Sequence, residues 1–278
     1  MDDKLHIISY SGGMGSFAEA KSCCDKYGPE NVLCIFADVH MEDPDTYRFI
    51  FETLEFLKCR SHYISQNKNP WELFKEKRFI GNTRVDICSS QLKRNPINNF
   101  IKENFCTSFK EMTYHRNKPA TYETRWKSDI AEIHLGIDYS EYHRLQETQK
   151  IMRPLIYRST LVEEGRIIPK DYSEQFGIKK PALYNLGFPH NNCGGFCVKA
   201  GLGQFKMLWE KLPERYAWHE QQEQETLALG GLPFLKIRRK DKPTRYISLK
   251  EYREEFLETN KAEEDTFDIG GCGCALPV

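Results

Sequence analysis

Apolar positions in the first 65 residues alternate between short continuous runs and helical spacing. A continuous apolar run occupies 32–37, β-forming residues dominate 5–10, and 60–65 is expected to be a third strand. The two intervening segments place apolar side chains three or four residues apart. Continuous apolar runs are typical of strands that are buried on both faces of a parallel sheet. The pattern therefore predicts a βαβαβ start and an α/β, doubly wound, mostly parallel sheet.

The spacing of apolar residues is less regular in the rest of the chain. We expect a short helix over 71–77, a fourth buried strand over 129–137, a helix near 169–176, two helices over 198–212 and 213–229, and a hairpin before a helix over 248–258. These elements predict an α/β domain over 1–185. They also predict a helical, cysteine-containing region over 186–278 with a basic hairpin and a mobile tail.

The segment between the first strand and the first helix is rich in glycine. It reads Ser11-Gly12-Gly13-Met14-Gly15-Ser16. Three glycines in four positions allow positive φ and close backbone approach, and the helix that follows offers N–H groups and the positive end of its dipole to an anion. The segment predicts a phosphate loop, although its spacing fits neither GxxxxGK[ST] nor GxGxxG. The alternative is a plain turn between strand and helix.

The second strand ends in Asp38. Ligands of doubly wound folds bind beyond the carboxyl ends of the strands, so we expect this carboxylate beside the glycine loop. A helix cap or a simple loop acid is the alternative.

Composition narrows the class of protein. The 278 residues are 40% apolar, and 40 basic residues balance 40 acidic ones, so any nucleic-acid contact must come from a local patch. The sequence has no apolar run of membrane-spanning length and no apolar leader, which predicts a soluble, cytoplasmic protein without a membrane partner. Ten cysteines in such a chain favour metal or sulfur chemistry over disulfides.

The glycine loop resembles the SGGxDS loop of the PP-loop ATP pyrophosphatases, with Gly15 where that family usually has Asp. Later segments are similar to the PAPS reductase-like branch of this superfamily. Residues 84–94 resemble its cysteine-plus-LK segment, and 136–144 resembles its G-x-R-x-x-E segment. Cys88 precedes Cys193 by 105 residues, close to the spacing between that branch's two cysteine pairs. The resemblance covers about residues 4–200.

This resemblance implies an adenine nucleotide alpha hydrolase-like fold that binds ATP with Mg²⁺. The implied nucleotide site consists of Ser11, Gly12, Gly13, Met14, Gly15, Ser16, Asp38, Lys93, Arg94, Gly136, Glu141 and Arg144. Asp38, Ser16 and Lys93 are the expected catalytic residues, with Asp38 replacing the metal-side contact that Gly15 lacks. For the charged members the alternatives are a solvated helix face and a surface ion pair. Asp138 stands where the reductases often have Arg, which implies loss of a PAPS-specific contact.

Three residues separate Cys193 from Cys197, and these two cysteines cannot fill four coordination positions alone. Cys88, His190, Cys272 and Cys274 are the candidates to complete the set. The resemblance implies a [4Fe-4S] cluster or Zn²⁺, whereas core packing or a redox pair are the alternatives. The tail cysteines either close this metal site or carry persulfide sulfur, and Cys274 is the expected catalytic thiol in the second case.

The resemblance to the Dnd- and Ssp-type enzymes implies an ATP pyrophosphatase that adenylates DNA or tRNA for sulfur insertion. A cysteine desulfurase and other modification subunits are the implied partners. Six basic residues within 236–245 offer one nucleic-acid contact, with a solvated face as the alternative. Two other functions stay open, a sulfonucleotide (PAPS or APS) reductase and a non-catalytic nucleotide-binding subunit of a complex.

Overall fold

A five-stranded parallel sheet forms the centre of the computed structural model, which describes residues 4–115, 118–238 and 243–259. The strand order is β3 (Arg60–Ser65), β2 (Val32–Asp38), β1 (Leu5–Ser9), β6 (Ala131–Leu135) and β7 (Tyr157–Arg158). Every residue of β2 and β6 is buried, as the continuous apolar runs predicted.

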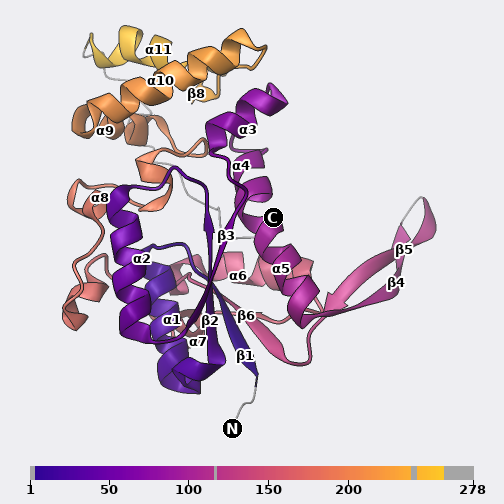
Figure 1. The fold of residues 1–278 in the computed structure, drawn as a ribbon. Helices are drawn as coiled ribbons and strands as arrows, with labels where there is room; N and C mark the ends of the chain where they lie inside the picture. The colour runs from indigo at the N-terminus through magenta and orange to yellow at the C-terminus, as the bar shows by residue number, and fades with distance from the viewer. Residues whose placement is uncertain (1–3, 116–117, 239–242, 260–278) are drawn as a thin grey trace.

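Helices cover both faces of this sheet (Figure 1). On one face, α1 (Met14–Tyr27) and α2 (Pro44–Leu57) share an apolar core with β1 and β2. On the other face, α5 (Asn95–Phe105) and α6 (Tyr142–Met152) share a core with β6. The predicted α/β class with a parallel sheet is confirmed, and the layering is compatible with a doubly wound fold. The strand order reverses between β1 and β6, where such sheets open a ligand crevice.

Local signals explain where several helices begin. Asp43 caps α2 by accepting a hydrogen bond from the Asp45 N–H (2.9 Å), and Pro44 occupies the first helical position. Asn69 and Glu72 form a capping box at the start of α3 (Pro70–Lys77). These caps place both helices close to their predicted bounds.

The elements after residue 77 follow the prediction less closely. The expected helix near 169–176 is a short 3₁₀ helix, η4 (Tyr172–Phe176), and the helix expected from 198 begins at Leu202. The remaining elements are η1 (Pro29–Asn31), α4 (Ile87–Ser89), the π-helix η2 (Ser90–Arg94), η3 (Tyr139–Glu141), α7 (Thr160–Glu163), α8 (Ala182–Asn185), η5 (Asn192–Gly195), α9 (Leu202–Lys211), α10 (Pro213–Ala228), β8 (Leu235–Ile237), β9 (Arg245–Ile247), α11 (Leu249–Tyr252) and the π-helix η6 (Arg253–Leu257).

The sequence pattern did not predict an antiparallel hairpin made of β4 (Thr107–His115) and β5 (Lys118–Lys127). These strands pair only with each other, and the hairpin projects away from the body beyond the end of α5 (Figure 1).

The helices of the C-terminal part gather at one end of the molecule beside α3 (Figure 1). Their core includes Trp71 and Phe74 of α3, and the Trp71 Nε1–H donates to His219 Nδ1 at 2.9 Å. Residues on both sides of the predicted 185/186 boundary therefore build one core. Among the described residues, no helix has both the length and the apolar character needed to cross a membrane.

Candidate functional site

The glycine loop leads directly into α1 and leaves the start of that helix open. Gly13 is the N-cap, no side chain caps the helix, and the first turn carries no acidic residue. The Ser16 hydroxyl donates to the Gly13 carbonyl oxygen at 2.8 Å, and the Ser11 hydroxyl donates to the Ser16 oxygen at 3.3 Å. Backbone N–H groups and the positive end of the helix dipole thus face outward from a braced loop, which suits an anion.

A cavity of about 430 Å³ lies at this loop, where the carboxyl ends of β1 and β6 separate. Ser11, Gly13, Met14, Gly15 and Ser16 form one wall. The volume falls within the range of small-ligand and cofactor sites. The predicted phosphate loop therefore borders a cavity.

The opposite wall of the cavity is apolar. Its side chains come from α5, β6 and their neighbours, namely Ile97, Ile101, Ile133, Leu135, Ile137 and Tyr157. One end of the cavity thus favours an anion and the other a flat apolar group.

Two of the predicted basic residues line the cavity from the π-helix η2. Lys93 Nζ lies 2.9 Å from Glu42 Oε1, whose side chain is fully buried, and Arg94 pairs with Asp86 at 2.7 Å. These ion pairs fix both cations at the cavity wall, so they are not part of a solvated helix face. π-Helical turns are frequent at functional sites because the wider turn redirects side chains.

The predicted segment after β6 also lines the cavity. Gly136, Glu141 and Arg144 all contribute to the wall, and Glu141 forms an ion pair with Arg144. Asp138 accepts hydrogen bonds from the Ser140 N–H (3.0 Å) and the Ile168 N–H (2.9 Å). Asp138 therefore caps η3 and ties two loops together at the cavity rim.

Asp38 does not line the cavity, and its expected position beside the loop is wrong. Side chains alternate along β2, so Ala37 lines the cavity while the Asp38 carboxylate accepts hydrogen bonds from Tyr47 Oη (2.7 Å) and Tyr63 Oη (2.6 Å). Burial would raise the pKa of this carboxyl, but the tyrosine hydrogen bonds outweigh burial and lower it below the ordinary value. Burial, followed by the contact with the Asp38 carboxylate, raises the pKa of Tyr63 to about 12.

Gly12 also stands outside the cavity wall. Its φ is +75°, and a Cβ there would lie 2.8 Å from the Ile50 side chain. Gly12 is therefore required for the turn and for packing on α2, and the nearer ligand contacts belong to Gly13.

Sequence reasoning missed several residues that complete the site. Asn191 donates to the Gly12 carbonyl oxygen at 3.1 Å, and Tyr184 Oη accepts from the Met14 N–H at 3.3 Å. Both residues line the cavity, as do Lys170 and His190. The sequence predicted His190 only as a metal ligand, and it gave no separate signal for its neighbour Asn191. The isolated Tyr184 carried no sequence signal.

The predicted cysteine site is only partly within the described residues. Cys88 packs against the small apolar cluster that contains Cys193, and Lys93 Nζ lies 3.9 Å from Cys193 Sγ. Cys193 has a positive φ of 52°, which is uncommon outside glycine. Within the described ranges, Cys88, Cys193 and Cys197 belong to no group of three closely spaced metal-ligating side chains. Cys272 and Cys274 lie outside those ranges, so a closed cysteine site stays a prediction.

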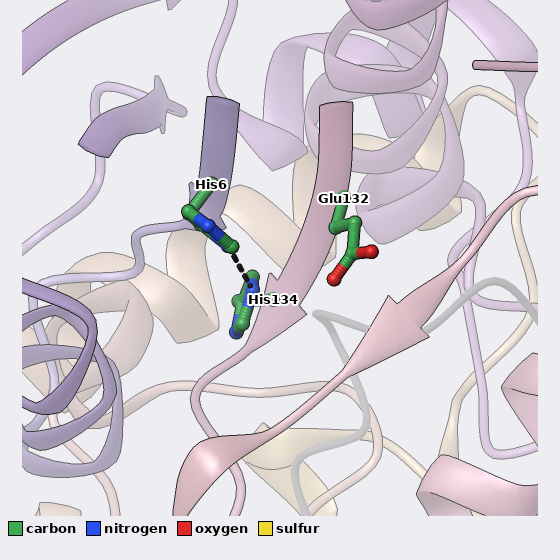
Figure 2. A group of neighbouring side chains, drawn as sticks. All are labelled: His6, Glu132 and His134. Carbon is green, nitrogen blue, oxygen red and sulfur yellow. Dashed lines mark hydrogen bonds between the residues drawn. The ribbon is translucent and has the colours of Figure 1, made fainter. Parts of the chain in front are cut away.

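Two other groups of buried side chains could hold a metal ion, and both include His134. Figure 2 shows the His6 and His134 rings directed at each other, with Glu132 beside them; His6 Nδ1 lies 3.0 Å from His134 Nε2. Glu132 already pairs with Lys4 (2.7 Å) and Arg158 (2.8 Å). Two adjacent cations oppose the binding of a third, so the contacts favour a structural role for this group.

The second group joins His134 to Glu19 and Cys23 of α1. The Glu19 carboxylate accepts from His134 Nδ1 (2.8 Å) and from the Thr160 N–H (2.8 Å) at the start of α7. Ser159 and the Leu161 N–H also donate to it, at 3.0 and 3.2 Å. These donors satisfy the buried carboxylate within the protein, and the network ties α1, β6 and α7 together.

Comparison of the sequence with protein-family profiles found no matching family, and comparison with curated proteins found no match. The function is therefore argued from the site itself.

Proposed function

We propose that the chain is an ATP pyrophosphatase of the PP-loop type that activates a nucleic acid for sulfur insertion. One observation carries the proposal. A single cavity joins the uncapped start of α1 to an apolar wall, at the point where the strand order reverses. This combination suits a ligand with an anionic end and a flat apolar end, such as an adenine nucleotide.

In this proposal the phosphates of ATP lie on the Ser11–Ser16 loop. The backbone N–H groups at the start of α1 bind them, and Lys93 and Arg94 supply positive charge from the neighbouring wall. Arg144 and Lys170 add two further cations along the cavity. The adenine occupies the apolar end, between the α5 and β6 side chains that include Ile101 and Leu135.

The proposed reaction is attack by an oxygen of the nucleic acid on the α-phosphorus of ATP. The new bond joins that oxygen to the α-phosphorus, and the bond from the α-phosphorus to the bridging oxygen breaks, so pyrophosphate leaves with the electron pair. The loop N–H groups and Lys93 stabilise the negative charge that develops on the leaving group. The outer sulfur of a cysteine persulfide on a partner such as a cysteine desulfurase then attacks the adenylated group, and AMP leaves with the oxygen and its electron pair. A second thiol of the partner cleaves the resulting S–S bond, which releases the thiolated product as a disulfide forms on the partner.

The side chains at the loop fit a magnesium ion that arrives bound to the triphosphate. Ser11 and Ser16 offer hydroxyl oxygens, whereas the cavity carboxylates Asp138 and Glu141 already accept hydrogen bonds or pair with Arg144. Mg²⁺ commonly keeps water and phosphate ligands with few protein ones. When bound, it neutralises charge on the departing pyrophosphate.

A pyrophosphate-release assay with ATP and Mg²⁺, with and without DNA or tRNA, tests the proposal. We expect ATP to bind and pyrophosphate to form faster when the acceptor is present. Binding without turnover for every acceptor would favour the non-catalytic subunit instead. Failure of ATP to bind would reject both.

A sulfonucleotide reductase is the second candidate, and the position of Cys193 favours it. Lys93 lines the cavity and also lies 3.9 Å from Cys193 Sγ, so a thiol stands directly behind the cavity wall. A nearby ammonium group stabilises the reactive thiolate. Tight binding of adenosine 5′-phosphosulfate with sulfite release, and no ATP turnover, would select this function.

A further inference from the structure

The β4–β5 hairpin exposes large side chains that no other described element covers along its length. Tyr114 is 81% exposed and Tyr122 is 67% exposed. An isolated two-stranded hairpin is marginally stable in water, so large aromatic side chains kept exposed on it indicate a binding surface. The hairpin lies outside the cavity wall, and the proposed nucleotide site does not use it.

The strand register separates two different faces. Residues directly opposite each other in an antiparallel pair point to the same side. Met112 pairs with Tyr122, and Ser108 pairs with Trp126, so the exposed Tyr122 ring and the half-buried Trp126 ring lie on one face together with Lys110. We call this the aromatic–basic face and define it by Lys110, Met112, Tyr122 and Trp126.

The other face carries charges of both signs, because Arg125 and Lys127 lie on it together with Glu111 and Glu123. Glu111 pairs with Glu123, and both carboxylates contact Arg125, at 3.0 and 3.2 Å. These two glutamates are the only acidic residues of 107–127. Lys110 on the aromatic–basic face donates to Thr124 Oγ1 at 2.7 Å and has no carboxylate on its own face. A polyanion therefore meets an unbalanced positive charge on the aromatic–basic face and balanced charges on the other face.

The base of the aromatic–basic face contacts α5, a helix that also lines the cavity. Ile97 and Ile101 of α5 line the cavity, and Lys102, the following residue, lies over the Trp126 ring at 5.6 Å from its centroid. Helix α5 then passes at Phe105 into β4 at Thr107. One helix thus forms the cavity wall and supports the base of the hairpin.

We propose that the aromatic–basic face binds single-stranded nucleic acid and directs it toward the cavity. This inference rests on the proposed function, for which it identifies the acceptor. Exposed aromatic rings stack on unpaired bases while lysines contact the phosphates, and this combination recurs in proteins that bind single strands. The lysines favour a negatively charged partner, and the exposed ring, which stacks on an unpaired base, favours a single strand over an acidic protein surface and over a duplex.

Fluorescence anisotropy of the full chain with labelled 20-nucleotide DNA and RNA tests the proposal. We expect Tyr122→Leu, which keeps an apolar strand residue but removes the ring, to weaken binding about tenfold. Tyr122→Phe should retain wild-type affinity. Lys110→Met should weaken binding and reduce its salt dependence. Phe109→Ala is the matched control, because Phe109 is an exposed aromatic paired with Arg125 on the opposite face.

Equal affinities of wild type and Tyr122→Leu would overturn the proposal, as would an equal loss in Phe109→Ala. Tighter binding of duplex than of single strands would also overturn it. A change from dimer to monomer in Tyr122→Leu, measured by light scattering, would show that the face joins two copies instead. ATP binding measured on the same samples separates the two proposals, since the hairpin variants should bind ATP normally.

Discussion

Gly15 and Gly136 touch through their backbones where the start of α1 meets the end of β6. A Cβ on Gly15 would lie 2.5 Å from the Gly136 carbonyl oxygen, and a Cβ on Gly136 would lie 2.4 Å from Ser16 Cα. Neither position has room for a side chain. The SGGxDS pattern has Asp at the position that Gly15 occupies here. Glycine at this position thus goes together with close packing of the glycine loop against the end of β6.

Restoring the missing loop acid with Gly15→Asp should therefore damage the protein. The new side chain must displace the Gly136 backbone, and overpacking of this kind costs about 1–3 kcal/mol of unfolding free energy. Nucleotide affinity should fall at the same time, because the start of α1 moves. Chemical denaturation and calorimetric ATP titration measure the two effects.

Gly13→Ala is the matched control for this loop. Its φ is −95°, and its Cβ would meet Ser11 Oγ at 3.4 Å and Tyr184 Oη at 3.6 Å, which are ordinary contacts. We expect normal stability for Gly13→Ala. A Gly15→Asp protein as stable as wild type, with improved ATP turnover, would contradict the packing argument.

Lys93 should contribute to nucleotide binding and, separately, to stability. Lys93→Met removes a cation from the cavity and leaves the buried Glu42 carboxylate without this ion pair. We expect ATP affinity to fall about tenfold, as for loss of one charged hydrogen bond, together with a lower unfolding free energy.

The double variant Lys93→Met with Glu42→Gln separates the two roles. It removes the buried charge as well as the cation, so stability should recover while ATP affinity stays low. Recovery of ATP affinity in the double variant would show that Lys93 acts only through folding.

Asp38→Asn should lower stability and leave ATP affinity unchanged. Its carboxylate accepts from Tyr47 and Tyr63 and does not line the cavity. Loss of a charged acceptor from two partly buried hydrogen bonds costs about 1 kcal/mol. Because the folded-state pKa is lowered, this stabilisation exists above the ordinary pKa of 3.8 and disappears as pH falls further. Denaturation at pH 7 and pH 3, with Tyr63→Phe as comparison, measures this stabilisation. A large loss of turnover in Asp38→Asn at normal stability would instead support a catalytic role for Asp38.

The sequence was sufficient to predict the parallel sheet and the glycine loop between β1 and α1, because buried runs and glycine spacing are local signals. It was not sufficient for the β4–β5 hairpin, whose faces carry polar residues such as Lys110 and Glu111 and lack a buried alternating set. The Asp38 error has a different origin. Strand ends lie at the crevice, but the direction of one side chain depends on partners such as Tyr63, 25 residues away.

Among the charged residues of the site, too, some were predicted from the sequence and others were not. Lys93 and Arg94 were found from a motif, but their partners Glu42 and Asp86 are fixed only by tertiary packing. Asn191 reaches the loop from 179 residues away. Such contacts follow from the fold and have no signature in the neighbouring sequence.

Glu223 should make stability fall as pH rises. It is fully buried in α10, and Oε2 accepts from the Leu249 N–H, while Oε1 has no hydrogen-bond partner among the described residues. Burial raises its pKa from 4.5 to about 8, so the folded state holds a proton that the unfolded state releases. The stabilisation that comes from the bound proton is fully present below pH 4.5. It decreases as the pH rises from 4.5 to about 8, by at most about 1.4 kcal/mol of unfolding free energy per pH unit.

Glu223→Gln should therefore be more stable than wild type at pH 8 and similar to it at pH 4.5, because the amide stays neutral throughout. Urea denaturation between pH 4.5 and pH 8 measures the difference. Glu225→Gln is the matched control, since Glu225 lies on the same helix, pairs with Lys75 at the surface and is exposed. Parallel pH profiles for wild type and Glu223→Gln would show that Glu223 ionises at its ordinary pKa, through solvent or a rearranged partner.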